Sequence, residues 1–139
     1  MDTDSEQLYR AVAAGLLILT HDGIGPALLG TATLMLEGCP LTAKLLNVST
    51  ESDPDQLLID TTELAEALDS GDGVLILTDL PGSTPSNIAA QIAGMKTNIR
   101  IVSGVNLSML IRILNYPDCS LEELTAKALS GGRDGIVQI

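Results

Sequence analysis

GVLILTDLPGSTP, residues 73–85, is the stretch that decides the fold, and GLLILTHDG, residues 15–23, repeats its first half. Each stretch starts with a glycine, continues through four aliphatic residues and reaches a threonine, which is followed by His21 in one case and by Asp79 in the other. A short run that is apolar at every position is typical of a strand buried on both faces. The two runs therefore predict an α/β fold around a parallel sheet.

Strands and helices alternate along the rest of the chain. Weaker strands are predicted at residues 44–48 and 99–103, and a last short strand at 135–139. Five helices are predicted. The first spans residues 24–37, with an apolar face of Ile24, Ala27, Leu28, Thr31, Leu34 and Met35, the second spans 54–70, and the third spans about 85–95. The fourth runs from the cap Asn106 to before Pro117, and the fifth from the capping box Ser120–Glu123 to Gly131-Gly132.

This order predicts a doubly wound, mainly parallel sheet with strand order 2-1-3-4 and helices on both faces. We expect residues 1–14 to form a flexible leader and residues 15–139 to form a single domain.

Composition excludes several kinds of protein. The net charge is −11, the seven basic residues are scattered, and two tyrosines are the only aromatic residues, so neither a nucleic-acid surface nor an aromatic carbohydrate groove is expected. A single histidine and two distant cysteines, Cys39 and Cys119, exclude a structural zinc site and argue against a disulfide. No apolar run is long enough to span a membrane and the acidic N-terminus is unlike a secretory signal, which predicts a cytoplasmic protein that is not integral to a membrane.

Nucleotide motifs are weak or absent. No GxxxxGK[ST] sequence is present, and the glycines of residues 23–30 are misplaced for a GxGxxG turn.

The candidate site lies where the two apolar strands end. In an open α/β sheet, ligands bind outside the carboxyl ends of the strands where the strand order reverses, which here lies between His21 and Asp79. A carboxylate bonded to one imidazole nitrogen fixes the tautomer and leaves the other nitrogen free to attack an electrophile. Asp22 is a competing carboxylate beside the same ring.

The loop after Asp79 supplies a second element. Gly82, Ser83 and Thr84 lead into a helix start, whose backbone N–H groups and hydroxyls can hold an anion. Together with His21 and Asp79 they predict phosphoryl transfer onto the histidine. Alternatives stay open at this point. The protein could be a hydrolase, although no serine lies in a GxSxG elbow. His21 could be a hydrogen-bonded loop residue without chemistry, Asp79 a structural cap, and Thr84-Pro85 a plain helix start.

Several motifs taken together resemble the mannose-type (mannose/fructose/sorbose) IIA component of the bacterial phosphoenolpyruvate-dependent sugar phosphotransferase system. The resemblance runs from Gly15 onward, in order and at similar spacing. The matching motifs are Leu19-Thr20-His21, residues 69–80, Thr84-Pro85-Ser86-Asn87-Ile88-Ala89-Ala90, residues 103–110, residues 120–124 and Gly131-Gly132-Arg133-Asp134-Gly135.

The resemblance implies a phosphocarrier without metal or cofactor. His21 would accept a phosphoryl group from the histidine-containing phosphocarrier protein, Asp79 would orient it, Thr84 would stand where the family usually has a serine, and Asn106 would border the site. It also implies a homodimer in which an antiparallel edge strand, here Ile136–Ile139, is exchanged between subunits. The next acceptor would be a IIB component.

The sequence departs from the family pattern at Asp22, where a glycine is common, in the loop 80–84, and at Ser108, where a proline is common. No IIB-like region follows in this sequence. We therefore keep three alternatives: a regulatory phosphoacceptor of an incomplete phosphotransferase system, whose partner would be a regulatory protein, a IIA-like subunit serving a dihydroxyacetone kinase, and a plain ligand-binding α/β domain. The sequence names no sugar.

Overall fold

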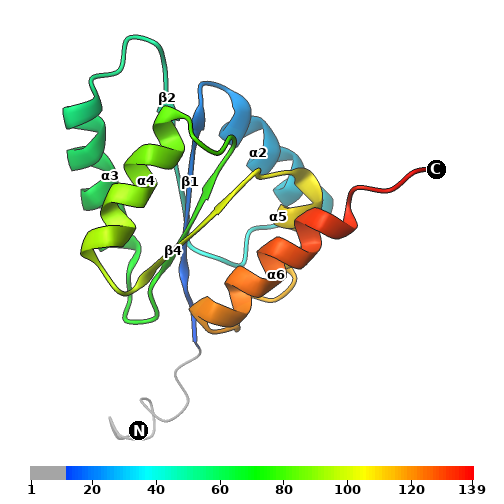
Figure 1. Ribbon diagram of the computed structural model, residues 1–139. Coiled ribbons are helices and arrows are strands. Elements are labelled where there is room, and N and C mark those ends of the chain that lie inside the picture. Colours follow the sequence, from blue (N-terminus) through cyan, green and yellow to red (C-terminus); the bar gives the residue numbers. More distant parts are fainter. Residues whose placement is uncertain (1–11) are drawn as a thin grey trace, which may run out of the picture.

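The two apolar runs form the central strands of a parallel sheet. In the computed structural model, which describes residues 12–139, they are β1 (Gly15–His21) and β3 (Val74–Thr78). β2 (Ala43–Val48) pairs with β1, and β4 (Ile99–Ser103) pairs with β3, all in parallel. The order is β2-β1-β3-β4 (Figure 1), so the predicted fold class and strand order are confirmed.

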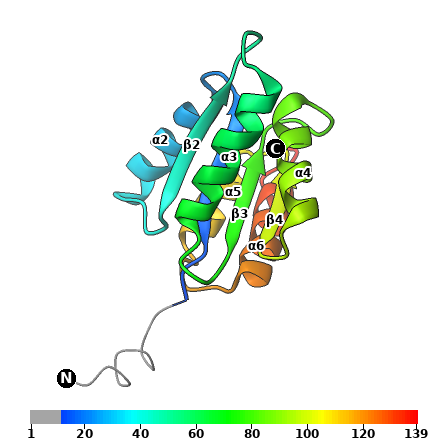
Figure 2. The ribbon, with the colours of Figure 1, turned by 90° about the vertical axis from the view of Figure 1, so that its left-hand side faces the viewer.

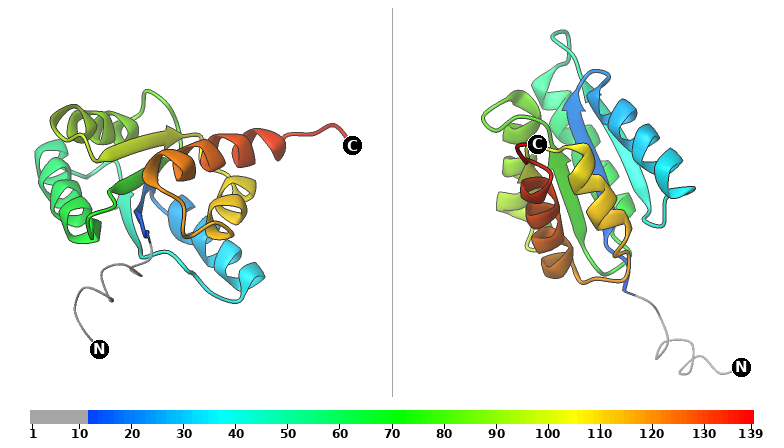
Figure 3. Two further views of the ribbon diagram at one scale, coloured as in Figure 1. Left: turned by 90° about the horizontal axis from the view of Figure 1, so that it is seen from below. Right: turned by 90° about the vertical axis from the view of Figure 1, so that its right-hand side faces the viewer.

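Helices cover both faces of this sheet. α3 (Pro54–Leu68) and α4 (Thr84–Met95) lie on one face, as Figure 2 shows. α2 (Ile24–Leu36), α5 (Leu107–Leu114) and α6 (Leu121–Asp134) lie on the other face, which is turned to the viewer in the right-hand view of Figure 3. Among residues 12–139, no helix is both long and apolar enough to cross a membrane.

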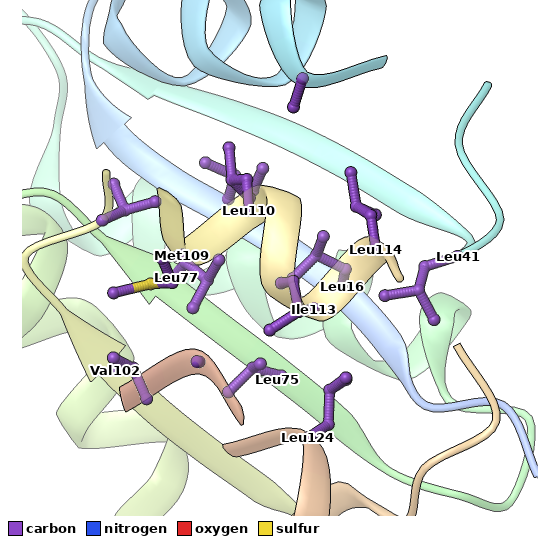
Figure 4. Packing of buried hydrophobic residues seen from close by; sticks show 14 of the residues in the cluster. Leu16, Leu41, Leu75, Leu77, Val102, Met109, Leu110, Ile113, Leu114 and Leu124 are labelled. Carbon is purple, nitrogen blue, oxygen red and sulfur yellow. The ribbon is translucent and has the colours of Figure 1, made fainter. Parts of the chain in front are cut away.

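Side chains of the central strands alternate between two hydrophobic clusters. Leu16 and Ile18 of β1 point toward α2, α5 and α6, whereas Leu17 and Leu19 point toward α3 and α4. Figure 4 shows the first cluster, with residues of α5 lying over those of β1 and β3. Each fully buried aliphatic side chain contributes about 1.5–3 kcal/mol, so burial on both faces holds the carboxyl ends of β1 and β3 side by side.

The start of the domain is packed against the sheet. Ala14 is buried, and the backbone N–H of Ala13 donates to Asp72 Oδ2 at 3.0 Å. Residues 13 and 14 of the predicted leader therefore belong to the packed body, while residues 1–11 lie outside the described residues.

The predicted end of the last helix at Gly131-Gly132 is wrong, because α6 continues to Asp134. Both glycines are buried where α6 crosses α5. A Cβ at Gly131 would lie 2.4 Å from Cβ of Arg112, and one at Gly132 would lie 2.9 Å from Cε of Met109. Gly131 and Gly132 lie inside α6 because the lack of a Cβ lets α6 pack closely against α5.

The predicted apolar face of the first helix is confirmed at Leu28, which packs partly buried against the core, but is wrong at Ile24, Leu34 and Met35, which are exposed. The fully buried residues of α2 are Gly25 and Ala32, whereas Leu34 is 82% exposed and Met35 is exposed as well. Small residues face the sheet because α2 lies very close to it, and a Cβ at Gly25 would be 3.0 Å from Thr20 Oγ1. Leu34 and Met35 lie on the outer surface, while Leu28, Leu29 and Leu36 are partly buried against the core.

The predicted last strand does not form within the single chain. Residues 135–139 have no strand pairing, and Ile136 and Val137 are 80% and 67% exposed. The segment leaves the body of the molecule beyond α6 (Figure 1). Exchange of this segment between two chains stays a prediction.

Candidate functional site

His21 and Asp79 meet at the carboxyl ends of β1 and β3, at the upper edge of the sheet in Figure 1. Asp79 Oδ2 lies 2.8 Å from Nδ1 of His21 and also accepts the backbone N–H of His21 at 3.1 Å. The carboxylate side chain is 9% exposed and the imidazole 45%. A buried carboxylate thus holds a ring that solvent can reach, and the ring's carboxylate partner is Asp79, while the competing Asp22 is exposed.

The charge of Asp79 determines the tautomer of His21. Burial alone would raise the pKa of Asp79, but hydrogen bonds from the side chain and the backbone N–H of His21 outweigh this effect and hold the pKa below its ordinary value of 3.8. Asp79 is therefore ionised near neutral pH and can only accept hydrogen bonds. Nδ1 must then carry the proton, and Nε2 keeps its lone pair.

The other oxygen of Asp79 has no partner. Among the described residues, Asp79 Oδ1 is the one buried side-chain nitrogen or oxygen atom without a hydrogen bond. Leaving such an acceptor unsatisfied costs about 1–3 kcal/mol.

The loop between β3 and α4 is a tight turn. Gly82 has φ +78°, which suits a glycine, and Ser83 N–H donates to the Leu80 carbonyl at 3.3 Å. Ser83 Oγ also donates to this carbonyl at 2.6 Å and does not cap the helix. Gly82 and Thr84 are exposed at the start of α4, where the first backbone N–H groups have no intrahelical partner.

Asn106 has a structural role in this chain. Its Oδ1 accepts the backbone N–H of Met109 at 2.9 Å and so caps α5, as predicted. Its Nδ2 donates to the Gly132 carbonyl at 3.3 Å, which ties α5 to α6. Both ends of the amide are therefore engaged with the fold, and a phosphoryl contact from Asn106 stays an expectation.

Sequence reasoning missed the hydroxyl groups around this site. Thr20 is fully buried; its Oγ1 accepts the N–H of Gly25 at 2.8 Å and donates to the His21 carbonyl at 2.9 Å. Thr78 Oγ1 lies 2.7 Å from Ser86 Oγ and 2.8 Å from Ser103 Oγ. One sequence pattern could have drawn attention to them, since a threonine directly precedes both His21 and Asp79.

No group of three or more His, Cys, Asp or Glu side chains in residues 12–139 is arranged to hold a metal ion. Cys39 and Cys119 are both free thiols.

Comparison with known proteins identifies relatives with this architecture. The family model described as PTS system fructose IIA component matches residues 15–129. The mannose-specific EIIAB component of Escherichia coli (strain K12) is 32% identical over 123 residues, which are 87% of this chain and 38% of that protein. The chain thus spans well under half the length of the curated relatives it matches.

Solved structures show the same fold. The mannose/sorbose specific IIA subunit of the phosphotransferase system from Enterococcus faecalis superposes with a TM-score of 0.80 at 24% identity, covering 91% of this chain and 95% of that one. The PTS IIA protein associated with the fucose utilization operon from Streptococcus pneumoniae gives a TM-score of 0.77 at 23% identity, covering 92% and 94%. Because the family model spans most of the chain from the first strand onward, the chain belongs to the mannose-type family of IIA components of the sugar phosphotransferase system.

Proposed function

We propose that the protein accepts a phosphoryl group on Nε2 of His21 from the histidine-containing phosphocarrier protein and passes it to a IIB-type partner in sugar transport, in the cytoplasm. The observation that carries this proposal is the 2.8 Å contact between His21 Nδ1 and Asp79 Oδ2, in which the carboxylate is buried and the ring is exposed. Membership of a family of phosphocarriers supports the same role.

The proposed transfer is an in-line exchange between two histidines. The lone pair of His21 Nε2 forms the new N–P bond while the N–P bond to the donor histidine breaks and its electron pair returns to the donor ring. His21 keeps its proton on Nδ1, so the phosphorylated ring is cationic and is stabilised by Asp79. Donor and product are both phosphoramidates, so positioning and anion stabilisation suffice, without metal or cofactor.

We propose that the start of α4 binds the phosphoryl oxygens. The N–H groups of Gly82 and Thr84 and the hydroxyl of Thr84 are the groups offered there, while Ser83 contributes through the shape of the turn because its hydroxyl is bonded to the Leu80 carbonyl. A helix N-terminus favours an anion through its free N–H groups and its dipole.

We further propose a homodimer in which the segment Ile136–Ile139 of each chain packs on the other. The support is an exposed apolar tail, exposed apolar residues on α2, and a groove of about 690 Å³ whose lining includes Met35, Ile111 and Tyr116. A chain shortened to end at Gly135 should sediment as a monomer in analytical ultracentrifugation. An unchanged dimer would show that the tail is not the exchanged element.

Phosphorylation of the intact protein tests the function directly. The protein is incubated with phosphoenolpyruvate, enzyme I and the phosphocarrier protein, and intact mass is measured before and after mild acid. We expect one acid-labile phosphoryl group on the wild type and none on His21→Ala. Absence of the adduct, with the donor active on another acceptor, would refute the proposal.

A second step identifies the acceptor. Discharge of the isolated phosphoprotein on adding a IIB component supports transport. Discharge only to a kinase subunit or a regulatory protein would replace that part of the proposal with one of the alternative roles of the same phosphohistidine.

A further inference from the structure

A cluster of three hydroxyl groups lies behind the candidate site, formed by Thr78, Ser86 and Ser103. They come from the end of β3, the first turn of α4 and the end of β4. Their oxygen atoms are 2.7 Å (Thr78–Ser86), 2.8 Å (Thr78–Ser103) and 3.2 Å (Ser86–Ser103) apart. Thr78 is fully buried. The cluster therefore joins β3, α4 and β4, and its outermost members, Thr78 and Ser103, are 25 residues apart in the sequence.

The cluster also binds the residue after Asp79. Ser86 Oγ donates to the Leu80 carbonyl at 2.7 Å, and the same carbonyl accepts the hydroxyl of Ser83 at 2.6 Å and its backbone N–H at 3.3 Å. Three donors on one carbonyl oxygen fix the orientation of the Leu80–Pro81 peptide plane, one residue beyond Asp79.

The residue before Asp79 is held as firmly. The carbonyl of Thr78 accepts the backbone N–H groups of Gly104 and Val105 at 2.9 and 3.0 Å, while its hydroxyl belongs to the cluster. Asp79 thus lies between Thr78, whose carbonyl is bonded to the loop after β4 and whose hydroxyl is bonded to Ser86 and Ser103, and Leu80, whose carbonyl is bonded to Ser83 and Ser86.

The unpartnered oxygen of Asp79 is a further observation that bears on how the carboxylate is held. A carboxylate that could turn freely would move Oδ1 toward water, because a buried acceptor without a hydrogen bond is unfavourable. Oδ1 is nevertheless buried and unpartnered, and Oδ2 points at His21.

We propose that Thr78, Ser86 and Ser103 are positioning residues, which hold Asp79 against His21 so that the imidazole is kept as the Nδ1–H tautomer with Nε2 free. This inference rests on the proposed phosphorylation of His21 for its kinetic consequence. None of the three hydroxyls needs to touch the phosphoryl group; they act through the backbone on either side of Asp79.

Thr78→Val and Ser86→Ala test the cluster, and Thr78→Ser is the conservative variant that restores the hydroxyl. The matched control is Thr61→Val. Thr61 is also fully buried and its hydroxyl donates to the Leu57 carbonyl at 2.6 Å, but it lies in the middle of α3. The control therefore measures what the loss of a buried hydroxyl does in general.

The tautomer is read directly by nitrogen NMR of the ring. Because His21 is the only histidine, ¹⁵N-histidine labelling gives the two ring nitrogens of a single residue. We expect the Nδ1–H form to dominate in the wild type, Thr61→Val and Thr78→Ser, and the two tautomers to become mixed in Thr78→Val and Ser86→Ala. The rate of phosphorylation should fall by ~3- to 10-fold in these two variants, the loss expected for one hydrogen bond, with the KM for the donor unchanged.

Two results would overturn the inference: wild-type nitrogen shifts and rates in both cluster variants, or an equal loss in Thr61→Val. A wild-type protein that is never phosphorylated would refute the proposed function instead, and the nitrogen shifts of the unphosphorylated variants would still decide whether the cluster positions Asp79.

Discussion

Replacing Asp79 with asparagine should slow phosphoryl transfer to His21 much more than it destabilises the fold. The substitution keeps the size of the side chain and an oxygen that can accept from Nδ1, but it removes the negative charge. The charge matters because the phosphorylated ring is cationic when Nδ1 keeps its proton. In the proposed reaction this cation would form with Nδ1 2.8 Å from a carboxylate oxygen.

The expected magnitude follows from this geometry. A hydrogen bond to a charged group contributes about 1.5–3 kcal/mol, against about 0.5–1.5 kcal/mol for a neutral one. The value for a charged group already contains the Coulomb attraction, which for unit charges 4 Å apart is about 4 kcal/mol near a protein surface and sets an upper limit on the loss. Water screens part of it because the ring is 45% exposed. We therefore expect a loss of about 2–3 kcal/mol in transition-state stabilisation, or ~30- to 150-fold in rate.

Stability should respond to pH in a defined direction. The pKa of Asp79 is held below its ordinary value of 3.8 in the folded protein. A lowered pKa means that the ionised carboxylate stabilises the fold above the unfolded pKa, and that this contribution is lost as pH falls through the folded one. Asp79→Asn should thus be modestly less stable than wild type at neutral pH, and the difference should shrink as pH falls below 3.8 and vanish below the lowered pKa of the folded protein.

Single-turnover phosphorylation followed by rapid acid-free quenching measures the rate, and thermal unfolding at neutral and acid pH measures stability. Asp118→Asn, an exposed position before α6, is the matched control and should leave both unchanged. A wild-type rate for Asp79→Asn, or a stability difference that widens in acid, would refute the reasoning.

Three further substitutions test the site and the packing. Asp22→Asn should increase the phosphorylated fraction at equilibrium by ~2- to 5-fold, because an exposed carboxylate beside His21 repels a phosphoryl dianion by on the order of 1 kcal/mol; intact mass at a fixed donor ratio measures it, and an unchanged fraction would show that Asp22 points away. Gly131→Ala should destabilise the fold by about 1–3 kcal/mol, because its Cβ would lie 2.4 Å from Cβ of Arg112. Gly30→Ala, in the interior of α2 with nothing within 4 Å of the new Cβ, should stabilise the fold by about 0.5–1 kcal/mol. Chemical denaturation measures the free energy of unfolding of both glycine variants, and a change of the same sign in both would contradict the packing argument.

The pairing of His21 with Asp79 could be predicted because it depends only on parallel strands that are buried on both faces. Such strands are recognisable from continuous aliphatic runs, and their carboxyl ends meet at one edge of the sheet. The residue that directly follows each run is therefore placed at this edge. The same reasoning gave the loop at Gly82–Thr84 its position.

The face of α2 and the end of α6 could not be predicted for a common reason. Periodicity in the sequence assigns the large apolar residues to the core, whereas α2 and α6 turn Gly25, Ala32, Gly131 and Gly132 toward their neighbours. Whether a glycine ends a helix or lets it approach another element depends on a distance between elements. That distance is set by the tertiary structure.

The hydroxyl groups of Thr20 and Thr78 hold the backbone at His21 and at Asp79 in a similar way. Thr20 ties the His21 carbonyl to the first turn of α2, and Thr78 ties the backbone around Asp79 to α4 and β4. In both cases a buried threonine at the end of a strand bonds to the helix that follows it in sequence. Because each residue of the pair is fixed to its own strand end, the 2.8 Å contact between them depends on the spacing of two adjacent paired strands. Both strands are central in the sheet and buried on both faces, so this part of the fold is suited to hold the histidine and its carboxylate at a constant distance, as the proposed phosphoryl transfer requires.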